Sequence, residues 1–234
     1  MSEAISSDAA RHRRAARNRR AAIILAAMLL PAGGALAQPA GPAAEIEASA
    51  SDSFSKRLNA AALARTKVRV TYDPAYLRIA YPGGDVAADR GVCSDVVIRA
   101  YRTLGIDLQQ LVHEDMRKAF DAYPAHWGLT RPDSNIDHRR VPNLETFLRR
   151  QGAALPKSEN ADDYKPGDLV AWNLRGPGGF LPHIGIVTDR IAPSGRPKIV
   201  HNIGAGPQLE DVLFSWPMTG HYRYQPTEFM TGGS

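Results

Sequence analysis

The apolar positions in the first half of the chain recur at the three- and four-residue spacing of amphipathic helices. The clearest run begins at Cys93, because Val97 and Ala100 share its side and Gly105 supplies a stop signal. The same criterion predicts helices over residues 54–62, 93–104, about 108–120 and 142–152, the last opened by Pro142. The first half of the domain is therefore expected to be mainly helical.

The second half changes to the alternating pattern of strands. Leu169, Val170 and Trp172 follow a Pro-Gly turn, and a shorter alternation occurs at Val68, Val70 and Tyr72. Two β-rich runs at 183–189 and 198–203 flank Pro193-Ser-Gly195, which predicts a hairpin, and 222–224 offers one more strand. Helices followed by antiparallel strands predict a single α+β domain over residues 54–226.

The N-terminus has the pattern of a secretory signal peptide rather than of a folded domain. Six arginines lie between residues 11 and 20, an apolar run covers 21–30, and Ala35-Leu-Ala37 fits a cleavage site for small residues. The run is too short to span a bilayer comfortably, although an uncleaved anchor remains an alternative. We therefore expect residues 1–37 to be removed and the protein to be periplasmic or secreted, with no stable membrane span after cleavage.

Composition and charge bear on the segments that flank the domain and on nucleic-acid binding. Residues 38–53 are rich in Ala, Pro, Ser and Glu and predict a disordered tether, while 227–234 predict a loose tail. The net charge of +5 belongs mostly to the signal peptide, because the 197 residues after it hold 23 basic and 22 acidic side chains. This balance gives no electrostatic basis for nucleic-acid binding.

Cys93 is the single cysteine of the chain and a candidate nucleophile. At a helix N-terminus, free N–H groups and the helix dipole favour thiolate, which is the reactive form, and could also hold an oxyanion. The sequence therefore predicts a thiol pKa below the free value of about 8.5. The alternative is that Cys93 is a small buried hydrophobe, as free cysteines often are.

Two histidines occupy the strands of the predicted hairpin. If paired residue numbers add to an even value such as 384 or 386, His183 and His201 share a face and lie within reach of each other. His183 could then take the thiol proton and His201 could orient it, an arrangement of nucleophile, base and orienter. Alternatively, both are hydrogen-bonded strand residues without chemistry.

Two aspartates are expected to be structural. Asp115 falls on the apolar side of the predicted helix at 108–120, so it should accept hydrogen bonds inside the domain. Asp168 ends a Pro-Gly-Asp turn and is expected to serve that turn and the start of the next strand.

These residues carry a resemblance to known families. Cys93-Ser-Asp-Val-Val, Lys165-Pro-Gly-Asp-Leu-Val and His183-Ile-Gly-Ile-Val resemble the NlpC-type papain-like cysteine peptidases, which cut peptidoglycan stem peptides. More closely, the run from Arg78 to Tyr224 resembles the bacterial family catalogued as domain of unknown function 1287. The blocks that carry this resemblance are Tyr81-Pro-Gly-Gly-Asp, His113-Glu-Asp-Met, Asn135-Ile-Asp-His-Arg-Arg-Val-Pro-Asn-Leu144, His201-Asn-Ile-Gly and Gly220-His-Tyr-Arg-Tyr224.

The resemblance implies a papain-like fold, with N-terminal helices packed on an antiparallel sheet or half-barrel. It assigns Cys93 as nucleophile, His183 as base, His201 as the orienting residue and Tyr81 as the tyrosine that assists the oxyanion. One departure is Asp95, which stands where NlpC-type enzymes usually carry a glycine. Another is the insert from His113 to Asn143, which has no counterpart in the minimal NlpC domain.

The insert contains the candidate substrate-binding residues. Asp137, His138, Arg139 and Arg140 could clamp a substrate carboxylate, because the planar fork of arginine matches that group, and a solvated loop with internal ion pairs is the alternative. We expect at least one of the two arginines to face the Cys93 cleft. Residues 121–143 lack a period, and a long loop of this kind is more often functional than idle.

The resulting prediction is an exported thiol hydrolase of the bacterial envelope that cleaves an amide or peptide bond of peptidoglycan. A non-catalytic binding module of the same fold and a thiol acyltransferase or esterase are the alternatives. No cofactor is expected. No metal site is expected either, since the histidines lack a spacing such as His-Glu-x-x-His.

Overall fold

The structure is a computed structural model that describes residues 42–226, with side chains from Asp52 onwards. The predicted signal peptide, residues 1–37, and the predicted loose tail, residues 227–234, lie outside the described residues. Among the described residues, no helix is long and apolar enough to cross a membrane.

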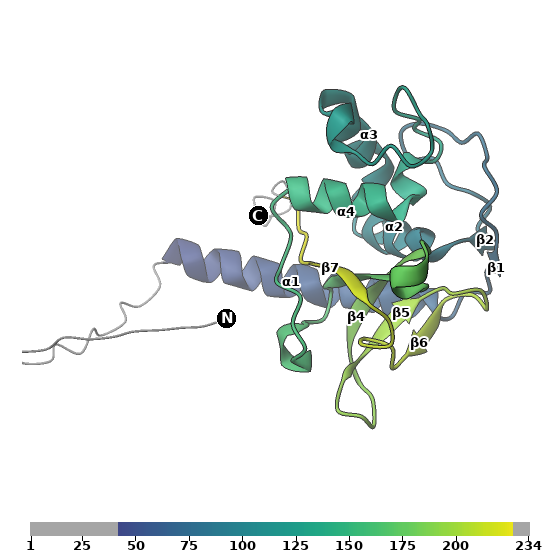
Figure 1. The fold of residues 1–234 in the computed structure, drawn as a ribbon. Coiled ribbons are helices and arrows are strands. Elements are labelled where there is room, and N and C mark those ends of the chain that lie inside the picture. The colour runs from purple at the N-terminus through teal and green to yellow at the C-terminus, as the bar shows by residue number, and fades with distance from the viewer. Residues whose placement is uncertain (1–41, 227–234) are drawn as a thin grey trace, which may run out of the picture. The chain divides into compact units, whose positions relative to one another are not determined.

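Four α-helices form most of the first half of the described chain (Figure 1). They are α1 (Pro42–Arg65), α2 (Cys93–Thr103), α3 (Leu108–Lys118) and α4 (Val141–Arg150). Gly105, with φ of 84°, follows the end of α2, and the Asp107 carboxylate caps α3 by accepting the N–H of Gln109. Short 3-10 turns follow at η1 (Phe120–Ala122), η2 (Asp137–Arg139), η3 (Ala161–Asp163) and η4 (Gly176–Gly178).

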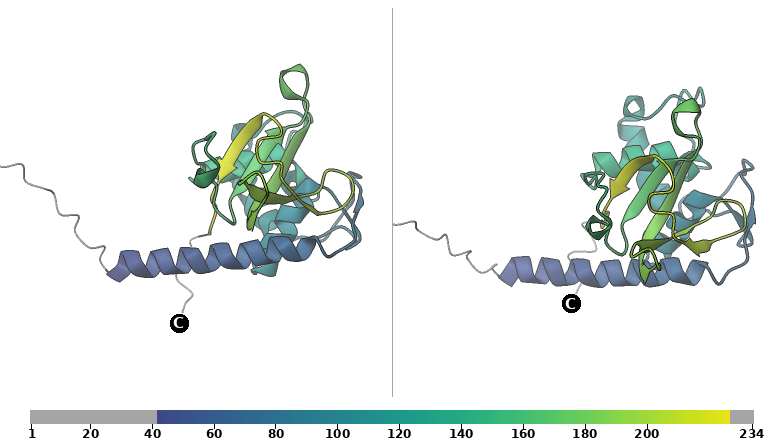
Figure 2. Two further views of the ribbon diagram at one scale, coloured as in Figure 1. Left: turned by 90° about the horizontal axis from the view of Figure 1, so that it is seen from below. Right: turned by 60° about the horizontal axis from the view of Figure 1, so that its bottom comes forward.

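The predicted tether is wrong from Pro42 onwards, because α1 begins there rather than near Phe54. Alanine and glutamate are frequent in this segment and are strong helix formers, so the composition that suggested disorder is also compatible with a helix. Later in α1, Leu58 and Ala62 are fully buried, and the helix contacts α2 and β4. Figure 2 shows α1 running alongside the sheet in both views.

Five strands form an antiparallel sheet in the order β6-β5-β4-β3-β7. They are β3 (Leu169–Asn173), β4 (Pro182–Ile191), β5 (Pro197–His201), β6 (Gln208–Glu210) and β7 (Met218–Tyr222), while β1 (Thr71–Tyr72) and β2 (Arg90–Gly91) form a separate parallel pair. The β4–β5 hairpin was predicted, whereas the three-residue β6 was not. The described chain is thus an α+β fold.

The two faces of the sheet belong to different parts of the core. Ile184 and Ile186 of β4 pack with the helices, in a cluster that includes Val97 and Leu144. On the other face, Trp172 and Ile199 pack with side chains of the chain segment before β7. This division matters for the site, because adjacent residues of β4 point to opposite faces.

Two aspartates hold neighbouring segments together through their carboxylates, as the sequence predicted. Asp115 accepts hydrogen bonds from Tyr123 at 2.6 Å and from Arg150 at 2.6 Å. Asp168 is fully buried and accepts from the N–H of Lys165, from His221 at 2.7 Å and from Arg223 at 2.7 Å. Both carboxylates therefore have structural partners.

We predict that Asp168→Asn lowers the free energy of unfolding by about 3 kcal/mol, because it leaves a buried network without its charge. Urea unfolding measures the change. Asp163→Asn, an exposed acidic residue of η3, is the control and should stay within about 0.5 kcal/mol of the parent protein. Equal stability of the two variants would contradict a structural role for Asp168.

Candidate active site

Cys93 is the first residue of α2 and is only 4% exposed. Its sulfur accepts hydrogen bonds from the backbone N–H groups of Ile184 and Ser94. Burial nevertheless dominates and raises the pKa of the Cys93 thiol to about 11, despite these hydrogen bonds. The predicted position at a helix N-terminus is confirmed, whereas the depressed pKa expected from it is not what the structure shows.

The hydrogen bond to Ile184 follows from the length of β5. The β4–β5 register pairs Ile186 with Val200, which would place Ile184 opposite position 202, one residue beyond the end of β5. The N–H of Ile184 therefore reaches the cysteine sulfur at the point where the neighbouring strand ends. This contact places the Cys93 sulfur against the backbone of Ile184, the residue that follows His183 in the chain.

The two strand histidines interact directly, as the even register predicted. The β4–β5 pairs add to 386 over most of the hairpin, so His183 and His201 lie diagonally on one face. His183 Nε2 lies 2.8 Å from His201 Nδ1, and both rings lie near Trp216. Burial lowers the pKa of His183 to about 3, so its imidazole is neutral at rest.

Gly185 makes room for this pair of histidines. It lies opposite His201 in the β4–β5 register. A Cβ atom at position 185 would lie 3.1 Å from the His201 Cβ and 2.6 Å from Ile199 Cγ2, closer than side chains tolerate. Packing therefore requires a glycine at position 185, because His201 and Ile199 occupy the space that a side chain there would need.

Glu210 extends the line of histidines and was missed by sequence reasoning. Its carboxylate oxygen lies 2.8 Å from His201 Nε2, an ion-pair distance, although the angle falls outside hydrogen-bond geometry. The Glu210 side chain is 42% exposed, whereas His201 is fully buried. Burial lowers the pKa of His201, and the glutamate opposes that effect. The only signal in the sequence is a three-residue strand, too short to predict.

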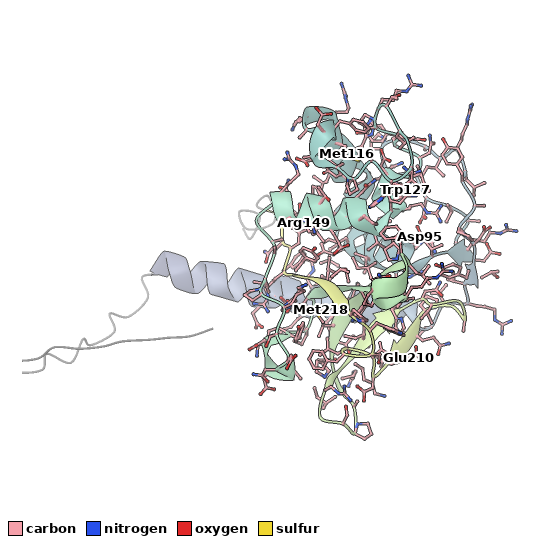
Figure 3. All side chains as sticks on the ribbon, in the orientation of Figure 1. Asp95, Met116, Trp127, Arg149, Glu210 and Met218 are labelled. Atoms are coloured by element: carbon pink, nitrogen blue, oxygen red, sulfur yellow. The ribbon has the colours of Figure 1, made fainter. Side chains whose placement is uncertain are left out.

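Asp95, at the position that departs from the NlpC-type motif, holds the N-terminus of α2. Its Oδ2 accepts the N–H of Val92 at 2.6 Å, and both of its oxygens accept hydrogen bonds from Arg139 at 2.9 Å. Both side chains are less than 5% exposed. Arg139 also donates to the carbonyl oxygens of Asp73 and Ala75. In the view of Figure 3, Asp95 lies between Trp127 and Glu210.

Three of the four predicted substrate-binding residues are buried, and two of these three, Arg139 and Asp137, have partners inside the domain, which corrects the prediction. Arg139 is committed to Asp95, and Asp137 is 1% exposed and accepts the N–H of Asp133. His138 is 2% exposed, and burial lowers its pKa to about 4. Arg140 remains half-buried and contacts Trp127 and Asp137. Only Arg140 therefore remains a candidate for binding a substrate carboxylate.

Tyr81 lies beside α3, and its assignment as the tyrosine that assists the oxyanion stays a prediction. Its ring packs edge-on against His113 of α3, and the Pro-Gly-Gly turn after it is fixed to α3 because Gly84 N–H donates to Gln109. Tyr72 is a tyrosine whose surroundings include Cys93. Burial, with the nearby Cys93 and Asp95, raises the pKa of Tyr72 to about 12, so its hydroxyl keeps its proton and can donate.

The resting site is therefore uncharged at its reactive atoms. The Cys93 thiol is protonated and His183 is neutral, and no hydrogen bond joins the two side chains among the described residues. His183 Nε2 is occupied by His201, which leaves Nδ1 as the nitrogen available to take a proton. Within residues 42–226, no group of three or more His, Cys, Asp or Glu side chains is arranged to hold a metal ion.

Comparisons with known proteins identify relatives. The family described as Domain of unknown function (DUF1287) matches residues 59–224. The Uncharacterized protein YijF of Escherichia coli (strain K12) is 61% identical over 153 residues, which cover 65% of this chain and 73% of that protein. No solved structure matches the chain.

The burial of Cys93 predicts slow alkylation at neutral pH. Because the folded thiol has a pKa of about 11 against about 8.5 when unfolded, reaction with iodoacetamide at pH 8 should be roughly a hundredfold slower in the folded protein than in urea. The folded rate should still be rising with pH at 9.5. A midpoint below 8.5 would instead support a thiolate activated at rest.

The pair of Asp95 and Arg139 predicts a second stability effect. Arg139→Lys keeps the charge but cannot reproduce the two-pronged contact, so the free energy of unfolding should fall by about 2–4 kcal/mol. The matched control is Arg131→Lys, an exposed arginine of the same segment, which should change it by less than about 0.5 kcal/mol. Indistinguishable unfolding curves would show that the ion pair is dispensable.

Proposed function

This chain belongs to the DUF1287 family, and we propose that it is an exported cysteine hydrolase of the bacterial envelope that cleaves an amide or peptide bond of peptidoglycan. The observation that carries the proposal is the hydrogen bond from Ile184 N–H to the Cys93 sulfur. It puts the one thiol against Ile184, the residue that follows His183 in β4, and the ring of His183 is itself held by a second histidine.

His183, His201 and Glu210 together allow His183 to accept the thiol proton. With His183 Nε2–H donating to His201 Nδ1, His201 carries its own proton on Nε2, facing Glu210. His183 Nδ1 is then an unprotonated acceptor. When it takes the thiol proton, the positive charge is shared along the line toward the glutamate, which stabilises it.

The reaction needs these side chains and one water molecule. The Cys93 sulfur attacks the amide carbonyl carbon, a C–S bond forms, and the thiol proton passes to His183 Nδ1. His183 returns that proton to the leaving nitrogen as the C–N bond breaks, which leaves a thioester. Water, deprotonated by His183, then attacks the thioester carbon and forms a C–O bond. The C–S bond breaks, and His183 returns the proton to the sulfur, which restores the thiol.

The developing oxyanion requires donors near the sulfur. The N–H groups of Ser94 and Ile184 already point at the sulfur, and the protonated hydroxyl of Tyr72 is close enough to sense the charge of Cys93. In this proposal Tyr72 assumes the role that the family resemblance gave to Tyr81. The proposed papain-like fold is consistent with the observed helices on one face of an antiparallel sheet.

The burial of Cys93 is also compatible with the non-catalytic alternative, which therefore needs its own test. A thiol that is 4% exposed and has a raised pKa is also what a non-catalytic envelope module of the same fold would show. Such a module would bind wall fragments without changing them. A thiol acyltransferase or esterase would yield products of a different mass.

Mass spectrometry of wall fragments incubated with variants tests the proposal. Cys93→Ser should lower the rate at least about 10³-fold and His183→Ala about 10²–10⁴-fold, since each removes a reacting group. His201→Ala should cost less, about 10–10²-fold, and Glu210→Gln less than tenfold because that side chain is partly exposed.

Asp163→Asn is the control for this series and should keep the parent rate. Full activity in Cys93→Ser would refute the nucleophile, and binding of fragments without any product would favour the module. The location is tested separately: N-terminal sequencing of the exported protein should find a start at or near Gln38, and an intact Met1 would contradict cleavage.

A further inference from the structure

A pocket of about 290 Å³ lies between α3, η1, the loop after it and the start of α4. Most of its wall is apolar or aromatic, and its polar members are Asp121, Arg140 and Asn143. Such a wall with a few polar groups is typical of sites for small ligands. The apolar and aromatic lining residues are Met116, Phe120, Tyr123, Pro124, Ala125, Trp127 and Leu129.

Asn143 supplies an acceptor that no described residue uses. It is 1% exposed, and its Nδ2 donates to the Asp137 carbonyl oxygen at 3.1 Å, which fixes the orientation of the amide. The Oδ1 atom of the same amide is buried and accepts no hydrogen bond from the part of the chain that the structure describes. Buried acceptors without a donor are uncommon in folded proteins, so this one requires an explanation.

Arg140 supplies donors at the same pocket. Its guanidinium carbon lies 4.3 Å from the centroid of the Trp127 ring, which orients the group by a cation–π contact. Within residues 52–226, its guanidinium makes one hydrogen bond, to Asp137 at 3.3 Å, and thus uses one of five N–H donors. The remaining donors suit an anion with two oxygens, such as a carboxylate.

Two chains of contacts connect this pocket to the candidate active site. The Ser94 hydroxyl, next to Cys93, donates to the carbonyl oxygen of Arg139, the residue before Arg140. On the other side, His126 lies between Trp127 and Phe180, with ring centroids 5.6 and 4.7 Å away, and Phe180 precedes His183 by three residues. In Figure 3, Trp127 lies between Met116 and Asp95.

We propose that this pocket is the specificity subsite of the enzyme, and that it binds a peptide residue with a small apolar side chain, a carboxylate and an N–H donor. The carboxylate pairs with Arg140, the N–H donates to Asn143 Oδ1, and the apolar group packs on Trp127. The inference rests on the proposed function for its role in catalysis, but the binding itself can be measured without turnover.

The test uses the full chain with Cys93→Ser, so that no ligand is consumed. The probe is N-acetyl-alanyl-alanine, compared with its C-terminal carboxamide and with the analogue whose last amide nitrogen is methylated. The chain has three tryptophans, so their indole N–H signals can be followed by NMR, and Trp127→Phe identifies the signal of Trp127.

The carboxylate probe should shift the Trp127 signal in a saturable way, with a dissociation constant at least tenfold lower than that of the carboxamide. Arg140→Gln should remove this difference, whereas Arg131→Gln, an exposed arginine of the same segment outside the pocket, should preserve it. The N-methylated probe should bind at least about fivefold more weakly, because it cannot donate to Asn143. Changing the probe avoids a variant at Asn143, which also supports η2.

The results separate this inference from the proposed function. Equal affinity for carboxylate and carboxamide, or an unmoved Trp127 signal, overturns the subsite, and equal affinity for the methylated probe overturns the role of Asn143. Hydrolysis of wall fragments with an unchanged KM in Arg140→Gln would leave the hydrolase standing and remove the subsite. Binding as expected, with no hydrolysis by the native protein, would support the subsite and contradict the proposed hydrolase.

Discussion

The buried ion pair between Asp95 and Arg139 fixes the geometry on which the candidate site depends. Asp95 accepts the N–H of Val92 and both prongs of the arginine, so the start of α2 cannot move without leaving a buried charge unpaired. Arg139 also holds the carbonyl oxygens of Asp73 and Ala75, which brings the segment after β1 to the same place. One guanidinium thereby joins three parts of the chain around Cys93.

The same ion pair explains why the insert matters to a site formed by other elements. Its backbone returns to α2, because the carbonyl oxygen of Arg139 accepts the Ser94 hydroxyl at 2.7 Å. Gly91 allows the close approach, since a Cβ there would lie 2.9 Å from the Asp95 carboxylate. Asp95, which departs from the NlpC-type pattern, is thus paired with Arg139. This arginine belongs to the insert that has no counterpart in the minimal NlpC domain.

Periodicity predicted the elements that position the site, but it could not assign partners to individual side chains. The helix beginning at Cys93 and the shared face of His183 and His201 follow from local spacing and strand register. Arg139 and Arg140, however, are neighbours in sequence with opposite roles, and only the packing of α2 against η2 separates them. Likewise, the thiol pKa is determined by burial, which depends on β4, far along the chain.

The burial that disfavours a resting thiolate also determines when the site could become reactive. Desolvation penalises each charged form separately, which raises the pKa of Cys93 and lowers that of His183. If the proton moves between them, the two opposite charges appear together in a region of low dielectric constant, where their attraction is strong. Glu210, at the far end of the histidine line, adds a negative charge that favours the imidazolium. In the attack proposed above, the substrate carbonyl takes up the negative charge of the sulfur as the C–S bond forms. This lowers the free-energy cost of moving the proton from Cys93 to His183. A thiol and an imidazole that are both neutral at rest are therefore compatible with catalysis.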